Sequence, residues 1–374
     1  MPAAYICFPG AKYTQDRASD AAHTVLKDWT ISVADSIPTD SDEAPTGYDA
    51  YVTDYDLLPF DRIAGKNIIC SSYYIRKALI RKHYLAHLLN THSIKKGVAL
   101  DVTPPTWILD IQFADELDEM LADDLYDLRD TLVQNKDFEN PEWFILKPGM
   151  ADQGNGIQLF SSLERLQEIF EAMEEQAEDG EESEGGDDQV YASQLRHYVI
   201  QKYLSRTLLV ALDDGDMHKF HLRAYVICVG GLQVYLHDEM LALFASAPYE
   251  LPNDSCDLSG HLSNTCLGSR RAASLRDGSL PTVSRFSELS GKQISAPGGH
   301  KRMLTANDIS SVHDGAVKAI GTVFGAVARE ASVHWQMWPN AFEIFGVDLM
   351  VTVSEDLSPD SFHVWLLEVN AVRD

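Results

Sequence analysis

The apolar residues at the start of the chain fall into four short runs that are separated by turn-forming residues. The runs AAYICF, TISVAD, YDAYVTDY and KNIICSS are each followed by a cluster that contains Gly, Pro, Asp or Ser. Short apolar runs with such boundaries are typical of strands. The pattern predicts a small Rossmann-like α/β domain over residues 1–72.

The spacing of the apolar residues changes to that of helices between residues 74 and 132. One apolar stripe predicts a helix over 74–92, and this helix also holds four basic residues. A second predicted helix, over 113–132, is rich in acids, which favours a solvated face. The stripe consists of Ile75, Leu79, Tyr84, Leu88 and Leu89, and the basic residues are Arg76, Lys77, Arg81 and Lys82.

A hairpin is predicted next, from the run EWFILKP, the polar glycine-rich turn MADQGNGI and the apolar run IQLF. A helix over 161–177 follows and leads into the tract EEQAEDGEESEGGDD, residues 174–188, which holds nine acids and no base. A segment this charged cannot bury enough apolar surface to fold, so we expect a disordered insert. We assign residues 73–195 to a central region of the protein.

The C-terminal region, residues 196–374, is predicted to hold a second antiparallel sheet. The runs HYVIQKYL, KFHLRAYVICVG and LQVYLHDEMLALFA alternate apolar and polar residues, as strands with one buried face do. Residues 268–299 lack periodicity and predict a long loop, and a helix over 307–331 follows it. Two apolar strands, FEIFGVDLMVTVS and FHVWLLEVN, complete the pattern.

The composition narrows the classes of function. The 57 acidic and 30 basic residues among 374 give a formal charge of −27, of which −18 remains without the acidic tract, so a nucleic-acid partner is not expected. No segment approaches the roughly 18 apolar residues of a membrane span, so we expect a cytoplasmic protein without membrane contact. The five cysteines are odd in number and form no CxxC pair, which predicts reduced thiols.

Lys147 is the first candidate for chemistry, because it ends an apolar strand and stands before a turn that contains Gly149, Gly154 and Gly156. A lysine at a strand end can simply reach solvent along its aliphatic stem. Glycines, however, let backbone amides approach an anion closely. The strand, the lysine and the turn together therefore suit a lid over nucleotide phosphates.

A row of cations is predicted in the run KFHLR. Lys219, His221 and Arg223 alternate with Phe220 and Leu222, so the first three share one face of a strand. A solvated edge strand is the competing interpretation of this row. Because the chain has few basic residues and places several of them here, we favour the binding of a polyphosphate.

Asp348, Glu368 and Asn370 lie among apolar residues in the runs GVDLM and LLEVN. A carboxylate in such surroundings needs a cation. Glu368 and Asn370 are two residues apart on one predicted strand and point the same way, so together with Asp348 they offer three oxygen ligands to Mg²⁺. A buried salt bridge is the alternative.

The ordered set of motifs resembles the fungal type of the tubulin-tyrosine-ligase-like branch of the ATP-grasp superfamily, from about residue 71 to residue 371. The motifs are SYYIRKALIRKHYL, WFILKPGMADQGNGI, VIQKYL, HKFHLRAYV, HLSN, FGVDLM and LLEVN. The resemblance implies an ATP-grasp fold of the α/β (α+β) class, in which two antiparallel sheets with flanking helices hold ATP. It implies that ATP contacts Lys77, Lys147, Gly154, Gln201, Lys202, Tyr203, Leu204, Lys219 and Arg223, that Arg223, Lys219 and Asn264 act at the γ-phosphate, and that Asp348, Glu368 and Asn370 hold Mg²⁺.

The implied reaction joins an amino acid to a protein or peptide carboxylate. The carboxylate attacks the γ-phosphate of ATP, and an amine captures the acyl phosphate as an amide while cations stabilise the transferring charge. Three residues depart from the pattern: Gln153 and Asp238 stand where family members usually carry arginine, and His221 stands where an aspartate is common. The given sequence also ends with EVNAVRD, whereas the resemblance implies that relatives continue past this point.

Two other functions are compatible with the motifs. One is a binding module that keeps the fold without ligase activity, as suggested for processing-body-associated fungal relatives that contact the mRNA decapping machinery. The acidic insert and the departing residues favour it. The other is a small-peptide ligase of a biosynthetic pathway. Acidic tubulin tails would be repelled by this acidic chain unless the predicted helix with Arg76, Lys77, Arg81 and Lys82 offers a basic patch.

Overall fold

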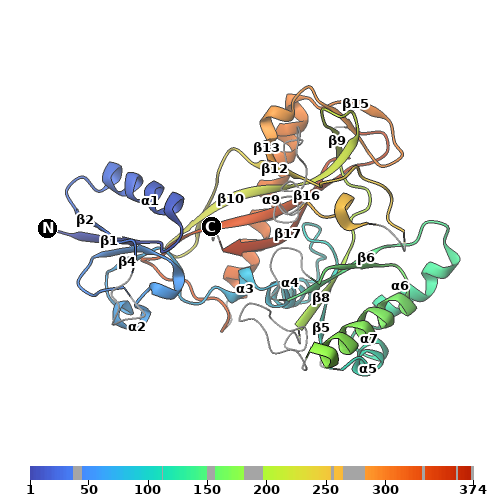
Figure 1. Ribbon diagram of the computed structural model, residues 1–374, viewed down its shortest axis with the longest axis horizontal. Helices are drawn as coiled ribbons and strands as arrows, with labels where there is room; N and C mark the ends of the chain where they lie inside the picture. Colours follow the sequence, from blue (N-terminus) through green and yellow to red (C-terminus); the bar gives the residue numbers. More distant parts are fainter. Residues whose placement is uncertain are drawn as a thin grey trace.

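The computed structural model describes residues 1–36, 44–111, 113–149, 156–180, 197–253, 257–263, 283–330, 333–358 and 361–371, with the backbone alone over 176–180. Gln153, Gly154, Asn264 and most of the predicted acidic insert lie outside these ranges. In Figure 1 a blue N-terminal sheet lies at one end of the molecule, and a green sheet lies below a long yellow-to-red sheet at the other.

The N-terminal region is a four-stranded parallel sheet in the order β2-β1-β3-β4. Parallel strands need a crossover between them, and helix α1 supplies the one between β1 and β2. The elements are β1 (Ala3–Cys7), α1 (Lys12–Val25), β2 (Thr30–Val33), β3 (Ala50–Thr53), the 3₁₀ turn η1 (Tyr55–Leu57), α2 (Phe60–Ile63) and β4 (Ile69–Cys70). The structure therefore confirms the α/β arrangement predicted for this part of the chain.

Each of the two long helices predicted between residues 74 and 132 is broken into two. Arg81 has an extended backbone that separates α3 (Lys77–Ile80) from α4 (Lys82–Lys96). Asp123 is likewise outside the helical region, between α5 (Glu116–Ala122) and α6 (Tyr126–Gln134). The apolar stripe predicted the buried positions Leu79, Leu88 and Leu89. It missed the break, because a change of direction at one residue hardly disturbs the spacing of the stripe.

The smaller antiparallel sheet has the strand order β5-β8-β6-β7. Its strands are β5 (Thr106–Asp110), β6 (Phe144–Pro148), β7 (Gln158–Phe160) and β8 (His197–Lys202), and α7 (Leu163–Gly180) and the 3₁₀ turn η2 (Asn135–Asp137) complete this part. One face packs in a cluster with α5, α6 and α7 through buried residues such as Leu128, Phe160 and Ile200. The predicted hairpin of β6 and β7 is confirmed.

Strand β8, the run HYVIQK, belongs to this smaller sheet and not to the second sheet, where the sequence analysis placed it. It pairs with β5 on one side and with β6 on the other. The alternation of apolar and polar residues identified β8 as a strand, but alternation holds no information about which strand will be its neighbour.

The larger sheet is built on the long strand β10 (Met217–Val229), which pairs with β16 (Phe342–Thr352) along eight residues. Strand β16 pairs in turn with β17 (His363–Ala371). Helix α9 (Ala306–Arg329) packs behind them, where Val347, Leu349 and Phe324 share one core. The other elements are β9 (Leu209–Ala211), β11 (Gln233–Leu236), β12 (Leu241–Phe244), η4 (Leu258–Gly260), β13 (Val283–Arg285), η5 (Phe286–Leu289), β14 (Gln293–Ser295) and β15 (Lys301–Met303).

The long loop predicted over 268–299 is wrong for its described part. Strands β13 and β14 and the turn η5 lie there, and the buried residues Phe286, Leu289 and Ile294 anchor them. Strands of three residues are too short to show alternation, so the pattern of apolar residues does not indicate them. The run LQVYLHDEMLALFA, predicted to be extended, contains the two strands β11 and β12.

The predictions of reduced cysteines and of no membrane span can be compared with the described residues. Cys7, Cys70 and Cys228 are buried free thiols, as predicted, while Cys256 and Cys266 lie outside the described ranges. Within those ranges, none of the helices combines the length and the apolar character that crossing a bilayer requires.

Candidate nucleotide and metal site

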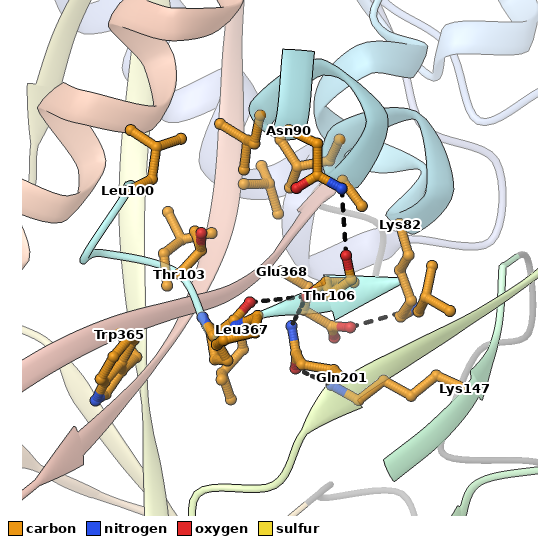
Figure 2. A pocket seen from close by; sticks show the side chains of 18 of the residues that line it. Lys82, Asn90, Leu100, Thr103, Thr106, Lys147, Gln201, Trp365, Leu367 and Glu368 are labelled. Atoms are coloured by element: carbon orange, nitrogen blue, oxygen red, sulfur yellow. Dashed lines mark hydrogen bonds and ion pairs between the residues drawn. The ribbon is translucent and has the colours of Figure 1, made fainter. Parts of the chain in front are cut away.

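A cavity of about 300 Å³ lies where helix α4 meets strands β6, β8 and β17. In Figure 2 Lys82 from α4, Lys147 from β6, Gln201 from β8 and Glu368 from β17 converge on it. Asn370 from β17 also lines the cavity. Residues from the two sheets and from α4 therefore meet at one cavity.

Hydrogen bonds within the smaller sheet position the side chain of Lys147. Its Nζ donates to Oε1 of Gln201 over 2.8 Å, and Nε2 of Gln201 donates to Oγ1 of Thr106 over 3.1 Å. Burial lowers the pKa of Lys147 to about 8, although the carboxylates of Glu368 and Asp348 act in the opposite direction. The ammonium group of Lys147 is therefore close enough to Glu368 and Asp348 of the larger sheet for their charges to affect its pKa.

The turn after Lys147 begins with a glycine that no other residue could replace without movement. A Cβ at Gly149 would lie 2.8 Å from Nδ1 of His83 and 2.9 Å from the carbonyl oxygen of His197. Gly156, at the other end of the turn, has φ of +71°, a conformation that favours glycine. Close packing at Gly149 and a positive φ at Gly156 thus explain why glycine occupies both described positions of the turn. Gly154 lies outside the described residues.

Strand β10 presents the predicted row of cations on one face. Lys219, His221 and Arg223 share one face of the strand, while Phe220 and Leu222 are buried in the large core on the other face. Strand β10 pairs with β12 on one side and with β16 on the other, so it lies inside the sheet. The interpretation as a solvated edge strand is therefore wrong.

Lys219 lies in a buried cluster of aromatic side chains. Its Nζ donates to the hydroxyl of Tyr203 over 2.7 Å and lies 4.1 Å from the centroid of the Tyr203 ring. The same hydroxyl contacts Nδ1 of His261 over 2.8 Å. Burial, together with the smaller effect of the Lys147 charge, lowers the pKa of Lys219 to about 7. A buried lysine without a carboxylate partner among these contacts can accept an anion.

Asp348, Glu368 and Asn370 form one group, as the sequence predicted. Asp348 and Glu368 are directly opposite each other on β16 and β17. Nδ2 of Asn370 donates to Oδ2 of Asp348 and to Oε1 of Glu368, both over 3.2 Å. Each acid also has a cation: Arg223 donates to both oxygens of Asp348, and Nζ of Lys82 lies 3.2 Å from Oε2 of Glu368. The alternative of a buried salt bridge is therefore present in this structure.

The donors of this group fit a divalent metal ion. Burial raises the pKa of Asp348, and the neighbouring charge of Glu368 adds to that effect. Burial also opposes ionisation of Glu368, but Lys82 and Lys147 outweigh it and hold the pKa of Glu368 well below its ordinary value. No three His, Cys, Asp or Glu side chains of the described part form a metal cluster by themselves. Two carboxylates and an amide suit a hard cation that takes its other ligands from phosphate and water.

His221 links this group to the loop before residue 264. Its Nδ1 lies 2.6 Å from Oγ of Ser263, and its Nε2 lies 3.6 Å from Oδ1 of Asp348. Nε2 is buried and has no hydrogen-bond partner among the described residues. Asp238, another departing residue, is exposed in the turn between β11 and β12.

The sequence and the fold both match known proteins. Residues 69–372 match the Tubulin-tyrosine ligase family. The chain belongs to this family. A probable tubulin–tyrosine ligase of Saccharomyces cerevisiae, PBY1, is 34% identical over 345 aligned positions, and the match covers 86% of this chain and 42% of that protein. A probable tubulin–tyrosine ligase of Schizosaccharomyces pombe is 35% identical over 338 positions, covering 86% of this chain and 75% of that protein.

A solved structure supports the fold of this family member over its whole length. The C-terminal domain of K. lactis Pby1, described as an ATP-grasp enzyme interacting with the mRNA decapping enzyme Dcp2, matches with a TM-score of 0.64 and 28% identity. The match covers 100% of this chain and 87% of that domain. The predicted family and the predicted ATP-grasp fold are therefore confirmed.

Some predicted contacts of this ATP-grasp chain lie away from the cavity. Lys202 points to the opposite side of β8 from Gln201, and its Nζ donates to Oε1 of Glu142 over 2.8 Å. Lys77 is exposed at the start of α3 and does not line the cavity, and Leu204 follows the end of β8. Asn264 lies outside the described residues.

Lys82 is a site residue that the sequence analysis did not assign to the site. The signal was present, because the predicted helix over 74–92 holds four basic residues in an acidic chain. We interpreted that helix as a patch for acidic tails, but Arg76 is buried, forms an ion pair with Glu343 and lies 4.1 Å from the centroid of the Tyr55 ring. Two of the four cations thus have partners inside the protein, which weakens the proposed patch.

Proposed function

We propose that the chain is an ATP- and Mg²⁺-dependent ligase that joins an amino acid to a protein or peptide carboxylate. The observation that carries this proposal is the convergence of Lys147 and Gln201 from one sheet with Glu368 and Asn370 from the other at one cavity. Arg223 and Asp348 lie beside Glu368 and Asn370 and complete the group. Cations on one side and oxygen ligands on the other are what a metal-bound triphosphate requires.

Each residue has a role that follows from its position. Lys147 and Lys219 are buried ammonium groups that neutralise phosphate oxygens. Arg223 has a planar guanidinium group that can exchange the carboxylate of Asp348 for a phosphate of similar geometry. Asp348, Glu368 and Asn370 would hold the metal, which withdraws charge from the transferring phosphoryl group when bound. Gln201 to Leu204 would border the adenine, and Lys77, Gly154, Lys202 and Asn264 complete the proposed set.

The proposed reaction has two steps that the cleft must accommodate. A carboxylate oxygen of the acceptor attacks the γ-phosphorus, the bond between that phosphorus and the β-phosphate oxygen breaks, and ADP leaves. The amine nitrogen then attacks the acyl carbon, inorganic phosphate leaves, and the nitrogen loses a proton to become the amide. Positioning and charge stabilisation suffice for both steps, so no nucleophile from the protein is needed.

Binding and turnover measured on the same preparation test the proposal. We expect calorimetry to detect a nonhydrolysable ATP analogue only when Mg²⁺ is present, and ADP release to require both an amino acid and a carboxylate acceptor. Glu368→Gln should abolish the metal-dependent part of the binding. Glu355→Gln is the matched control, because Glu355 is exposed, pairs with Arg206 and does not line the cavity. Equal binding by both variants would refute the assignment of the site.

A second function, a nucleotide-binding module that acts through a protein partner in the cytoplasm, is favoured by one comparison. The structural relative from K. lactis is described as interacting with a decapping enzyme. In this function Arg223 would stay paired with Asp348 when nucleotide binds. ADP release separates the two functions, because a binding module would bind ATP without releasing ADP for any pair of donor and acceptor. A ligase of a small-peptide pathway would instead release ADP with peptide acceptors.

A further inference from the structure

The face of β10 that holds the row of cations changes from buried to exposed along the strand. Lys219 and His221 are 3% and 5% exposed, the side chain of Arg223 is 28% exposed, and Tyr225 and Ile227 are each 36% exposed. These five residues are spaced two apart and therefore share one face of β10. An accessible surface thus begins at Arg223 and follows β10 toward the N-terminal sheet (Figure 1).

The strands beside β10 widen this surface with further apolar side chains. Ile227 is directly opposite Ile344 of β16 on one side and Tyr235 of β11 on the other. Residues that are directly opposite in antiparallel strands share a face, so the three form one row across three strands. Ile344 is 46% exposed and Tyr235 is 54% exposed. Together with Tyr225 they are here called the apolar face, and none of the four belongs to a hydrophobic cluster of the described residues.

The apolar face begins beside the proposed site. Tyr225 is directly opposite Gly346 of β16, and Gly346 is directly opposite Asn370 of β17, which lines the cavity. At about 4.8 Å per strand, the backbone of Tyr225 lies about 10 Å from that of Asn370. The side chain of Arg223 lies over the glycine between them, since a Cβ at Gly346 would be 3.2 Å from Cδ of Arg223. Arg223 therefore forms the border between the proposed metal ligands and the apolar face.

A charged ligand would find no partner on this face beyond Arg223. The described residues that continue it in β10, β11 and β16 are Val229, Gln233 and Phe342, and none of its positions past Arg223 holds Lys, Arg, Asp or Glu. His237, which follows β11, lies at its border, where its backbone N–H donates to the carbonyl oxygen of Tyr225. In a chain with a formal charge of −27, a run of acids would therefore be repelled here, whereas apolar side chains would gain by leaving water.

We propose that the apolar face binds the residues that precede the reacting carboxylate of the acceptor, which is a protein or peptide C-terminus with uncharged, apolar residues just before its last residue. This inference rests on the proposed ligase function and names the class of its acceptor. Ile227 lies four residues beyond Arg223, a distance of about 13 Å that an extended peptide covers with about four residues. In the other direction along β10, His221 and Lys219 are buried. The acceptor can therefore follow this face in one direction only, which suits a carboxylate at the end of a chain.

Fluorescence anisotropy with three labelled heptapeptides tests the class of acceptor. The peptides end in the same residue and carry leucine and phenylalanine, glycine and serine, or glutamate at the four positions before it. With a nonhydrolysable ATP analogue and Mg²⁺ present, we expect the apolar peptide to bind at least about tenfold more tightly than the glycine-serine peptide, and the glutamate peptide to bind no better than that one. Equal affinities, or a preference for glutamate, would overturn the inference even if the nucleotide binds as proposed. Failure of the nucleotide analogue to bind would instead refute the ligase, and the inference with it.

Two altered peptides test the direction in which the acceptor lies. Amidation of the terminal carboxylate of the apolar peptide should weaken its binding at least about fivefold, because its charge-assisted hydrogen bonds at the border of the site are lost. Moving the four apolar residues to the start of the heptapeptide should weaken binding by a similar factor, since they would no longer reach the apolar face. Unchanged binding of the amidated peptide would show that the face binds apolar segments without regard to the reaction, and the inference would be wrong.

A change of charge on the apolar face tests the place. Ile344→Lys should weaken the apolar peptide at least about tenfold and strengthen the glutamate peptide at least about tenfold, while the ATP analogue stays within about threefold. Ile94→Lys is the matched control, because Ile94 is 82% exposed on α4 and does not line the cavity. Tyr235→Lys, on the short strand β11, gives the same test if Ile344→Lys does not fold. An unchanged preference in the folded variants would place the acceptor elsewhere and contradict the inference.

Light scattering separates the acceptor from a second copy of the chain as the occupant of the apolar face. We expect the wild-type protein to be monomeric at the concentrations of the peptide assay, and Ile344→Lys to leave its mass unchanged. If the wild type is a dimer that Ile344→Lys dissociates, the apolar face is an interface between two copies, and the inference is overturned.

Discussion

Two pairs of arginine and aspartate in this protein are both bidentate but have opposite electrostatics. Arg302 donates to the two oxygens of Asp308 over 2.6 and 2.9 Å, and Arg223 donates to those of Asp348 over 2.5 and 3.1 Å. Yet the pKa of Asp308 is lowered, whereas that of Asp348 is raised. The surroundings of each pair explain the difference.

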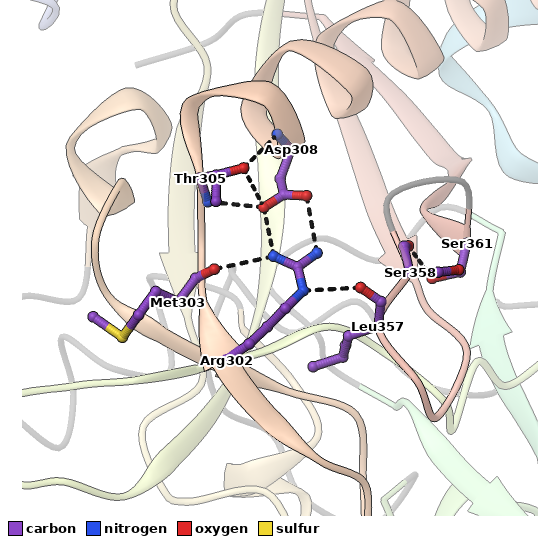
Figure 3. A network of polar contacts seen from close by, with 7 residues as sticks. All are labelled: Arg302, Met303, Thr305, Asp308, Leu357, Ser358 and Ser361. Atoms are coloured by element: carbon purple, nitrogen blue, oxygen red, sulfur yellow. Dashed lines mark hydrogen bonds and ion pairs between the residues drawn. The ribbon is translucent and has the colours of Figure 1, made fainter.

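The pair at the start of α9 is complete (Figure 3). Thr305 donates its backbone N–H and its hydroxyl to Asp308 over 2.8 and 2.7 Å, in a capping box for the helix. The remaining donors of Arg302 bind the carbonyl oxygens of Leu357 and Met303. Burial acts to raise the pKa of Asp308, but the bonds from Arg302 and Thr305 outweigh it. The protein itself thus satisfies the charge of Asp308.

The pair in the site is incomplete. Burial is the largest influence on the pKa of Asp348, and Glu368 adds a second negative charge beside it, so Arg223 and His221 do not restore the ordinary pKa. Nε2 of His221 faces the same carboxylate without a hydrogen-bond partner among the described residues. Such a site gains when a cation arrives between the acids. The geometry of an ion pair alone therefore does not distinguish a structural pair from a functional one, but the balance of charges around it does.

The largest effect on stability is expected at the complete pair. Asp308→Asn should lower the free energy of unfolding by about 3 kcal/mol, because it leaves Arg302 without its buried partner and weakens the cap. Denaturant unfolding at pH 7 measures this loss. Because the pKa of Asp308 is lowered in the folded protein, its stabilisation is present above the ordinary pKa of about 4 and fades at lower pH, so the difference between wild type and variant should shrink there.

The double variant Arg302→Met, Asp308→Leu separates the pair from its parts. Removing both charges leaves no unpaired group, so the double variant should lose less stability than Asp308→Asn. Nucleotide binding should stay unchanged in both, since neither residue lines the cavity. A double variant less stable than the single one would mean that the network stabilises the fold by more than the pairing of its charges.

The next largest effect is expected on turnover, at the incomplete pair. If the chain is the proposed ligase, Asp348→Asn should reduce its turnover at least about 100-fold, because a proposed metal ligand is lost, while the free energy of unfolding should change by less than about 1 kcal/mol. The sign follows from the raised pKa, since a carboxylate that is harder to ionise in the folded state does not stabilise the fold at pH 7. A large loss of stability without a loss of turnover would reverse the comparison between the two pairs.

The sequence could predict the incomplete pair better than the complete one. Asp348, Glu368 and Asn370 stand out as polar residues in apolar strands, and period two places Glu368 and Asn370 on one face. Arg302 and Asp308 lie in ordinary polar surroundings and give no such signal. Lys82 was missed as a site residue because its partner Glu368 is 286 positions away in the chain, and helix periodicity holds no information about distant strands.

The fold was predictable where an element is long and has either a clear alternation, as in β10, or a continuous apolar run, as in β16 and β17. Strands β10, β16 and β17 have 13, 11 and 9 residues, and the sequence identified all three. Strands β13 and β14 have three residues each and were missed. The placement of β8 in the smaller sheet was also missed, because the pairing partner of a strand is decided by tertiary packing and not by its own pattern.

A smaller effect is expected from Lys219, a buried cation whose contacts include no carboxylate. Its pKa of about 7 means that the group is mostly neutral at pH 8, so binding of a triphosphate should draw a proton onto it. Calorimetry at pH 8 in two buffers of different ionisation enthalpy should reveal an uptake of up to about one proton, which should fall at pH 6, where Lys219 is already charged.

Two variants assign that proton. Lys219→Met should remove most of the uptake, and the remainder would belong to Lys147, whose pKa is about 8. His237→Gln is a control at an exposed titratable residue outside the cavity and should leave the uptake unchanged. An unchanged uptake in Lys219→Met would mean that this lysine does not meet the phosphates.

The smallest effect is expected at Lys202, whose side chain has a partner as Arg302 does. The family resemblance places Lys202 at the nucleotide, but its Nζ donates to Glu142 on the opposite side of β8. Only its backbone can then border the adenine, so Lys202→Ala should change nucleotide affinity by less than about threefold and cost less than about 1 kcal/mol of stability, as exposed pairs do. Lys147→Ala, on the neighbouring strand, should weaken the nucleotide at least about tenfold in the same assay. A loss in Lys202→Ala as large as that in Lys147→Ala would mean that Lys202 leaves Glu142 when nucleotide binds. The Lys202–Glu142 pair would then resemble Arg223–Asp348, which is proposed to open for a ligand, and not Arg302–Asp308.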